Sequence, residues 1–408
     1  MIMQDNEKKP ALRFKGFTDP WEQRKLGDAF ERVVRKNTNN ESRLPLTISA
    51  QDGLVDQITY FNNRVASRDV SNYYLVYNGE FAYNKSTSDG YPFGAVKRLD
   101  WYEKGVLSTL YIVFALKHPE KDDSDFMTVF YDTDRWHRGV AERAAEGARN
   151  HGLLNISADD FFDIDTTMPE DKVEQEKIGR LLKKLDTLIT LHQRKYEKLV
   201  NIKKSMLDKM FPQNGASVPE IRFKGFTDPW EQRKLGEVFE EYSEKNHAEL
   251  PPLTIIQGGG TIRRDESERA LQYDKSSLSN YKMVNKDDFI VHLRSFEGGL
   301  EKASSQGIIS PAYHTFHGED VDSRFYYAYF RSKNFINKDL KPHVYGIRDG
   351  RSIDIEGMKT IRIPWASYPE QKSIGDFLTH LDTLITLHQR KLEKLQNIKK
   401  SCLEKMFV

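Results

Sequence analysis

The sequence contains a single cysteine, Cys402, and no long apolar run. One cysteine excludes an internal disulfide and a zinc cluster built from several thiolates. No stretch approaches the roughly 18 to 20 apolar residues that a membrane-spanning helix needs. The opening residues 1–10 are polar and charged and lack the apolar core of a secretory leader. We therefore expect a soluble, cytoplasmic protein that does not associate with membranes.

Net charge is nearly absent too, because 62 lysine and arginine residues are balanced by 61 aspartate and glutamate residues. Domains that bind nucleic acid usually carry a basic excess, so composition alone favours a neutral interaction protein. The 408 residues, 38% of them hydrophobic, are sufficient for two folded domains with connecting elements.

Familiar catalytic motifs are missing from the sequence. It has no Asn-Pro-Pro-Tyr or Asp-Pro-Pro-Tyr of an amino-methyltransferase, no Walker A motif and no His-Glu-x-x-His. Residues 296–299, Phe-Glu-Gly-Gly, weakly resemble a loop that binds S-adenosylmethionine, but no second motif supports this and we expect a simple turn. His314 and His317 alternate faces of an expected strand, which indicates packing rather than metal binding. We therefore expect no catalytic centre, metal or cofactor on this chain.

Two segments of the sequence occur twice. Residues 13–27 read RFKGFTDPWEQRKLG, and residues 222–236 repeat all fifteen letters. Further along, LDTLITLHQRK occurs at 185–195 and again at 381–391. The chain is therefore a duplication, in which an opening segment, an unlike middle part and a closing segment follow one another twice. Near-identical ends around diverged middle parts indicate one scaffold that carries two different surfaces.

Each closing segment is predicted to form a long helix, because apolar residues recur at spacings of three and four for nearly five heptads without an internal proline. Such a stripe needs a partner helix, and the other copy is the obvious one. His192 and His388 are interpreted as polar residues that fix the register of the pair, and Cys402 as a small buried apolar residue. The predicted interface of the helix pair consists of Ile178, Leu181, Leu185, Leu188, His192, Leu199 and Ile202, with Ile374, Phe377, Leu381, Leu384, His388, Leu395 and Ile398 of the second copy.

The two middle parts are predicted to be mixed, strand-rich domains of one fold. β-Branched and aromatic runs bounded by glycine, asparagine and aspartate favour strands. We expect strands at 74–77, 109–115 and 127–131 in the first middle part, and at 289–291 and 325–330 in the second. Asp123-Ser124 and Asp322-Ser323 are among the few short matches between the two parts.

Loops of the middle parts carry basic and small polar side chains next to aromatic residues. Such side chains can hold phosphates and read base edges in the grooves of DNA. The run 258–260, Gly-Gly-Gly, would let a backbone approach a phosphate closely, although a flexible loop explains it equally well. The candidate DNA contacts are Lys85, Ser86, Thr87, Ser88, Arg135, His137 and Arg138 in the first half, and Arg263, Arg264, Arg294, Ser295, Arg348 and Arg351 in the second.

The repeated segments carry a family resemblance. Trp-Glu-Gln-Arg-Lys-Leu-Gly opens each half, and Glu-Gln-x-x-Ile-Gly leads into Leu-Asp-Thr-Leu-Ile-Thr at 174–190 and 370–386. In this order and duplication the chain resembles the specificity subunit of type I restriction-modification systems over essentially its whole length. The repeated segments match the conserved regions of that family, and the unlike parts match its two target recognition domains.

The resemblance implies a DNA reader without catalytic activity of its own. It implies that each recognition domain reads one half of a split, asymmetric double-stranded DNA target and that the paired helices set the gap. Two modification subunits are expected to dock on this scaffold, bind S-adenosylmethionine and methylate adenine at N6. Restriction subunits, which use ATP and Mg, are expected to translocate along unmodified DNA and cleave it.

The predicted architecture is an α+β fold with two similar mixed α/β target recognition domains. Two long helices, paired as an antiparallel coiled coil, separate the domains. We expect an N-terminal domain at 1–168 with its opening repeat at 11–28, a first spacer helix at 169–211, a linker at 212–219, a C-terminal domain at 220–366 and a second spacer helix at 367–408.

Two other functions are compatible with parts of the sequence. A self-sufficient methyltransferase or nuclease is disfavoured by the missing motifs. A coiled-coil interaction scaffold with two protein-binding domains accounts for the repeat and the neutral charge. It does not explain why the scaffold stayed nearly identical while the middle parts diverged.

Overall fold

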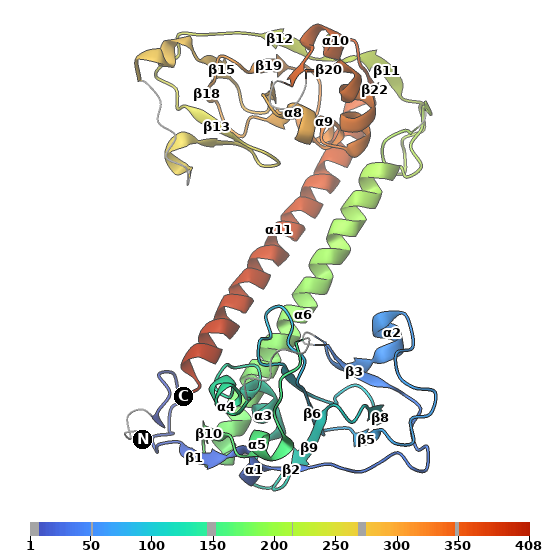
Figure 1. Ribbon diagram of the computed structural model, residues 1–408. Coiled ribbons are helices and arrows are strands. Elements are labelled where there is room, and N and C mark those ends of the chain that lie inside the picture. Colours follow the sequence, from blue (N-terminus) through green and yellow to red (C-terminus); the bar gives the residue numbers. More distant parts are fainter. Residues whose placement is uncertain (1–7, 50–51, 145–151, 214, 268–274, 347–350) are drawn as a thin grey trace. The chain divides into compact units, whose positions relative to one another are not determined.

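The computed structural model describes residues 8–49, 52–144, 152–213, 215–267, 275–346 and 351–408. The chain divides into two compact units, Met1–His192 with Lys391–Val408 and Gln193–Arg390. The first unit is therefore discontinuous in sequence and includes the C-terminal end of the chain, as Figure 1 shows. Each of the two long helices contributes one part to each unit. Among the described residues, no helix combines the length and the apolar character that a membrane span requires.

The first unit is built on a four-stranded antiparallel sheet in the order β2-β9-β6-β7. Its elements are β1 (Glu22–Lys25), α1 (Leu26–Ala29), β2 (Phe30–Arg32), β3 (Leu46–Ser49), β4 (Gly53–Asp56), α2 (Gln57–Phe61), β5 (Tyr74–Tyr77), β6 (Phe81–Asn84), β7 (Ala95–Arg98), β8 (Lys104–Leu107), β9 (Ile112–Leu116), α3 (Ser124–Phe130), α4 (His137–Arg143), α5 (Ala158–Phe162), β10 (Asp165–Met168) and the beginning of α6 (Lys172–Lys209).

Both faces of this sheet are covered. Alternate residues of a strand point to opposite faces, so each face has its own core. Phe81, Tyr83 and Phe114 on one face pack against α3, α4 and α5. Ala82 and Val113 on the other face pack against the strand pairs β3–β4 and β5–β8. The central strands β6 and β9 are therefore buried nearly throughout, which explains their continuous apolar character.

The second unit repeats the arrangement with a sheet in the order β12-β19-β16-β17. Its elements are β11 (Glu231–Lys234), α7 (Leu235–Val238), β12 (Glu240–Tyr242), β13 (Leu253–Ile256), β14 (Gly260–Arg263), η2 (Arg264–Glu266), η3 (Lys275–Asn280), β15 (Lys282–Val284), β16 (Phe289–Val291), α8 (Ser295–Gly298), β17 (Glu301–Lys302), β18 (Gly307–Ile309), β19 (His314–His317), α9 (Ser323–Phe330), η4 (Phe335–Leu340), η5 (Lys341–His343), β20 (Val344–Tyr345), β21 (Ser352–Ile353), α10 (Ile355–Lys359), β22 (Arg362–Trp365) and the beginning of α11 (Tyr368–Lys405).

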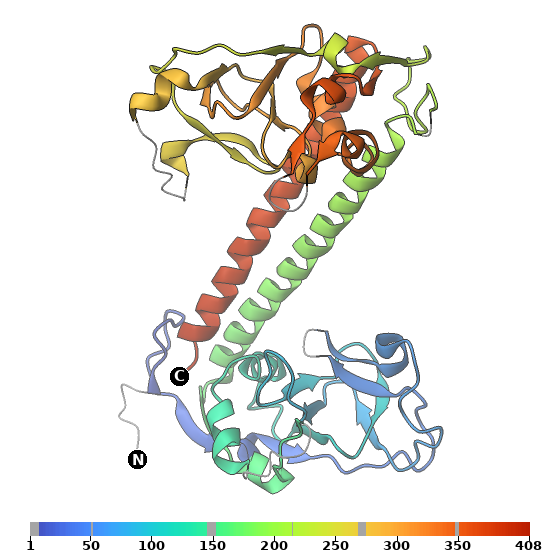
Figure 2. The ribbon, with the colours of Figure 1, turned by 45° about the horizontal axis from the view of Figure 1, so that its top comes forward.

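The core of the second unit follows the same plan, and Figure 2 shows the unit from another side. Phe289, Val291 and Phe316 pack against α9. On the opposite face, Ile290 and Ala303 pack against the strand pairs β13–β14 and β15–β18. The shared strand order confirms the predicted mixed α/β fold in both halves.

The long helices α6 and α11 run antiparallel within each unit. In the first unit the start of α6 and the end of α11 meet one segment, because Arg13 binds Glu174 and the Leu12 N–H donates to the carbonyl of Lys405 (2.8 Å). Farther along, Lys399 of α11 lies 2.6 Å from Asp186 of α6. Successive contacts lie later in α6 and earlier in α11, so the two helices are antiparallel in this unit. In the second unit, Arg222–Glu370, Ile221–Lys209 and Lys203–Asp382 repeat the pattern.

The buried stripe of the long helices differs from the predicted one. Ile178, Leu185, Ile374, Leu381 and Cys402 are buried as expected for heptad position a, but the other buried apolar side chains of the stripe are Leu182, Leu378 and Leu392, at position e. Ile398, a predicted interface residue, is 39% exposed, so the prediction is wrong there. The residues at half-buried positions are Leu181, Leu188, His192, Leu199, Ile202, Phe377, Leu384, His388 and Leu395.

Two of the expected strands are helices. Residues 127–131 lie largely in α3 and residues 325–330 in α9. Each helix begins after an aspartate whose carboxylate accepts a backbone N–H of the first turn, Asp123 from Phe126 and Asp322 from Arg324 and Phe325. The aromatic runs favoured strands, but the aspartate N-caps decide the local structure.

Candidate nucleic-acid interface

A buried ion pair attaches each opening segment to the start of a long helix. Arg13 donates to both carboxylate oxygens of Glu174 at 2.6 and 2.7 Å, and the Glu174 side chain is 1% exposed. Arg222 and Glu370 form the same pair at 2.6 and 2.8 Å. A two-pronged guanidinium–carboxylate contact fixes orientation as well as distance. The repeated letters therefore encode the joint between the sheet domain and the helix.

The adjoining glutamine makes a second joint in each unit. The side-chain oxygen of Gln175 accepts the N–H of Asp123 (2.8 Å), and that of Gln371 accepts the N–H of Asp322 (3.0 Å). Both aspartates are the N-caps of α3 and α9, so the glutamines hold those helices to the long ones. This explains why the Glu-Gln pair occurs in both copies.

The first unit brings the 85–94 connection between β6 and β7 next to α4. The ring of Phe93 lies 5.0 Å from the ring of His137, and burial lowers the pKa of His137. Arg138, at the start of the same helix, is 88% exposed and pairs with Glu142 at 2.8 Å. His137 therefore lies against the connection that carries the candidates 85–88, and Arg138 is its neighbour on α4.

Within the 85–94 connection, the candidate side chains differ in availability. Ser86 and Ser88 are exposed, whereas Lys85 and Thr87 are half-buried. Lys85 donates to the carbonyl of Ile156, and the Thr87 hydroxyl donates to the carbonyl of Gly152 (2.9 Å). Lys85 and Thr87 thus also hold the connection in place.

Arg135 has a different role from the predicted one. Its guanidinium donates to the carbonyls of Glu404 (3.2 Å) and Phe407 (3.3 Å) at the end of α11. The last carbonyls of a helix lack partners within the helix, and a cation there is favourable. Arg135 therefore caps α11, and the prediction that it contacts DNA is not supported.

In the second unit the equivalent connection is 292–300, between β16 and β17. It begins as its counterpart does, because His292 Nδ1 accepts the N–H of Arg294 (3.2 Å) and Asn84 accepts the N–H of Ser86 (3.0 Å). Arg294 is exposed. Ser295 is fully buried and its hydroxyl accepts the His292 N–H (2.9 Å), so the prediction that Ser295 contacts DNA is wrong.

The remaining candidates of the second half fall into separate places. The guanidinium of Arg351 lies over the ring of Phe296 at 5.6 Å, which puts it against α8, the helix that Arg294 precedes as its N-cap. Arg263 pairs with Asp265, and Arg264 lies over the ring of Tyr281, at the end of the β13–β14 hairpin away from its turn. Arg348 lies outside the described residues.

One exposed polar residue beside α8, Gln257, is not among the candidates taken from the sequence. It begins the turn of the β13–β14 hairpin, followed by Gly258 and Gly259. A signal was present, because a short glycine-rich run between two β-branched segments predicts a hairpin. The two interpretations of the run 258–260, a close approach to phosphate and a flexible loop, both left Gln257 aside.

A pH-dependent stability is expected from His292. Burial, and secondly the charge of Arg331, lowers the pKa of His292 to about 4, against roughly 6.5 in an unfolded chain. Between about pH 6.5 and pH 4 the unfolded chain therefore binds a proton that the folded chain does not, so stability falls as pH falls and levels off below this range. The urea midpoint of His292→Asn, which keeps an acceptor as Asn84 does, should fall less than that of the wild type between pH 7 and pH 5.

His380→Asn is the matched control, because His380 is exposed on α11. The wild type and His380→Asn should decline together. If His292→Asn declined in parallel with both, the assignment of this pH dependence to His292 would be incorrect.

Comparison with known proteins finds similar sequences and one similar solved structure. The model of the type I restriction modification DNA specificity domain matches residues 227–397. The type I restriction enzyme MjaVIII specificity subunit of Methanocaldococcus jannaschii is 24% identical over 317 residues, covering 73% of this chain and 72% of the relative. The putative type I restriction enzyme MjaX specificity subunit of the same organism is 22% identical over 406 residues, covering 94% of this chain and 91% of the relative.

The fold agrees with a solved structure of similar extent. The crystal structure of a type I restriction-modification S subunit from M. genitalium matches with a TM-score of 0.58 and 14% identity, over 98% of this chain and 99% of that one. The resemblance seen in the repeated segments is thereby confirmed. Over nearly its whole length the chain is similar to type I restriction-modification specificity subunits, and residues 227–397 match the model of their DNA specificity domain.

Proposed function

We propose that each unit of this chain reads one half of a bipartite, asymmetric double-stranded DNA target and that the chain itself has no catalytic centre. One observation carries the proposal. The units share their sheet order and their buried Arg–Glu joint, yet the connection from the third strand of the sheet to its edge strand differs in length and in sequence, 85–94 in one and 292–300 in the other. Unlike connections on a common scaffold fit two unlike half-sites.

The long helices are proposed to set the gap between the half-sites. Each contains 38 residues, or about 57 Å at 1.5 Å per residue. One turn of DNA is about 34 Å long, so the helices have the length to separate two readers by a turn or more. An antiparallel pair is stiffer than a single helix, which suits a fixed spacing.

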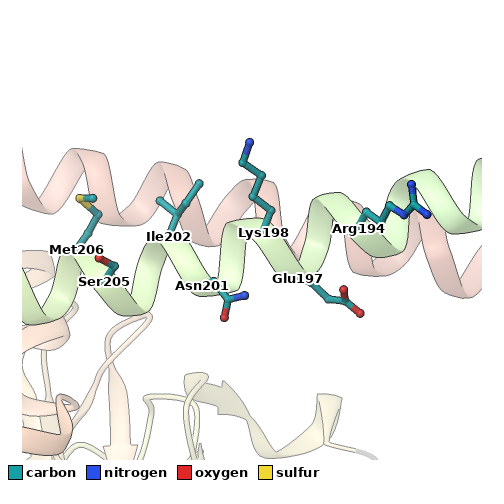
Figure 3. A pocket seen from close by; sticks show the side chains of 7 residues that line it. All are labelled: Arg194, Glu197, Lys198, Asn201, Ile202, Ser205 and Met206. Atoms are coloured by element: carbon teal, nitrogen blue, oxygen red, sulfur yellow. The ribbon is translucent and has the colours of Figure 1, made fainter. Parts of the chain in front are cut away.

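The helices are also proposed to carry two modification subunits, which supply S-adenosylmethionine chemistry, and restriction subunits, which supply ATP-dependent cleavage. The C-terminal half of α6 presents a shallow open groove with basic, acidic and apolar side chains, shown in Figure 3. A mixed surface of this kind suits a protein partner. Near-neutral net charge is compatible with DNA binding if these partners provide many of the phosphate contacts. Cytoplasmic location stays a prediction.

A domain exchange tests the proposal. Replacement of residues 30–165 by the corresponding part of another family member should change one half of the methylated target and leave the other half unchanged. The measurement is methylome sequencing of cells that express the chain with its modification subunit. The matched exchange of residues 239–361 should change the other half. A change of both halves by either exchange would contradict independent reading.

The alternative function is an interaction scaffold with two protein-binding domains. It predicts that the chain with its modification subunit shows no sequence-dependent mobility shift with DNA. The exposed arginines Arg138, Arg294 and Arg351 favour the DNA reader, because guanidinium groups suit both phosphates and base edges.

A further inference from the structure

The turn of the β13–β14 hairpin is exposed but firmly held. The N–H of Gly259 donates to the carbonyl of Ile256 (2.9 Å), and Gly258 has a φ of +85°, which favours glycine at this position. Gln257, Gly258 and Gly259 are all exposed. The turn thus presents one polar side chain, Gln257, flanked by bare backbone.

The turn is anchored by a buried carboxylate, that of Glu301 at the start of β17. The Glu301 side chain is fully buried, and its two oxygens accept the N–H of Gly258 (2.7 Å), the N–H of Gly260 (3.1 Å) and the hydroxyl of Tyr327 (2.8 Å). Arg331 completes the set as its ion-pair partner. Burying a carboxylate is costly unless it is paired and hydrogen-bonded, as it is here.

The hydrogen bonds from the turn to the Glu301 carboxylate are not required to form a hairpin. A hairpin turn is normally closed by its own backbone bonds, and β13 and β14 are already paired along their length. A buried side chain that fixes an exposed turn from behind is the arrangement expected for a binding element held in its productive geometry.

The position of Gln257 is constrained by its neighbours. A Cβ added at Gly298 of α8 would lie 2.4 Å from Nε2 of Gln257, so the glutamine side chain lies directly against this glycine. The absence of a side chain at position 298 makes the room. Gln257 is therefore held against α8, the element that also carries Phe296 beneath Arg351 and follows the exposed Arg294.

The surface formed by Gln257, residues 293–298 and Arg351 has the charge and polarity that DNA reading requires. Arg294 and Arg351 are exposed, and guanidinium groups hold phosphates. Leu293 is 66% exposed and adds an apolar contact of the kind that thymine methyl groups accept. The primary amide of glutamine offers one donor and one acceptor side by side, which matches N7 and N6 of adenine in the major groove.

We propose that Gln257 is a specificity-determining residue that reads an adenine in the half-site of the second unit, and that Glu301 is the positioning residue that holds it there. The inference rests on the proposed function and extends it to a named residue and base. It assigns the glycines of this turn a role, because they allow the backbone to approach the groove closely.

The decisive variant is Gln257→Ala, expressed with the modification subunit and analysed by methylome sequencing. Because Gln257 is exposed, the variant should fold. Preference for adenine at one position of one half-site should fall by about tenfold to a hundredfold, the value of one bidentate base contact, while the other half-site stays unchanged. Gln306→Ala is the matched control, an exposed glutamine of the same unit whose amide donates to Asn285, and it should leave the target unchanged.

The role of Glu301 is tested by Glu301→Gln, with Glu297→Gln on the exposed side of α8 as its control. A positioning residue should relax discrimination at the same base pair that Gln257→Ala relaxes. A purely structural residue would instead lower methylation at every position equally.

Gln257→Glu is an independent test of the same residue. A second acceptor in place of the donor should shift the base preference from adenine towards cytosine.

Two outcomes distinguish a failure of the proposed function from a failure of the role assigned to Gln257. If the wild-type complex showed no sequence-dependent methylation or binding, the proposed function and this inference would both be overturned. If the wild type methylated a defined target and both Gln257 variants left it unaltered at every position, the inference would be overturned and the proposed function would stand.

Discussion

Phe407→Ala is expected to lower the free energy of unfolding of the first unit by about 3 to 5 kcal/mol, the usual loss for a buried phenylalanine. The Phe407 ring is 3% exposed, stacks on Phe126 at 5.5 Å and meets the edge of Trp21 at 6.1 Å. These partners belong to the opening repeat and to α3, far from Phe407 in sequence. Urea unfolding followed by circular dichroism measures the loss.

The duplication offers matched variants for this experiment. Phe211→Ala should destabilise the second unit by a similar amount, because Phe211 packs on Phe325 at 4.9 Å and on Trp230 at 6.2 Å. Leu387→Ala on α11 should cost no more than about 0.5 kcal/mol, because Leu387 is 45% exposed. A loss at Phe407 as small as that at Leu387 would show that the end of α11 is not part of the first unit's core.

A seven-residue insertion in both long helices is expected to lengthen the gap in the DNA target by about three base pairs. Seven helical residues advance by about 10.5 Å and complete nearly two turns, so the buried stripe keeps its face. Base pairs are spaced by about 3.4 Å. The insertions belong after His192 and after Arg390, where the chain passes between units. Methylome sequencing should find both half-sites unchanged and their separation increased.

Insertion in α6 alone is the control. It moves only one helix of the antiparallel pair, so contacts such as Lys399–Asp186 and Lys203–Asp382 lose their register. Stability and methylation should then both fall. An unchanged gap after the double insertion, with methylation retained, would contradict the proposed spacing role of the helices.

The local errors of the sequence interpretation have identifiable causes. At 127–131 and 325–330 the aromatic and β-branched residues favoured strands, but Asp123 and Asp322 cap helices there. The weak match Asp-Ser between the two middle parts was itself the cap signal. In a chain with both faces of a sheet covered, strands and buried helices are equally apolar, so apolarity does not separate them.

The candidate DNA contacts were also predicted correctly only in part. Basic residues on loops were identifiable by type, and Arg138, Arg294 and Arg351 are indeed exposed. Residue type alone did not indicate that Arg135 caps α11 or that Ser295 is buried. The buried Glu301 had no recognisable sequence signal, because its four donors come from two segments distant in sequence from each other and from Glu301 itself, the 258–260 turn and the end of α9.

The sequence by itself determined the duplication, the long helices and the family resemblance, because these depend on identity between the copies and on a periodic pattern along the chain. Only the tertiary structure decided which end of the chain completes which unit. Residues 391–408 belong to the first unit because Met406 and Phe407 are buried there beside Trp21. Such a contact joins residues almost the whole chain apart, and no local pattern records which surface a helix end will cover.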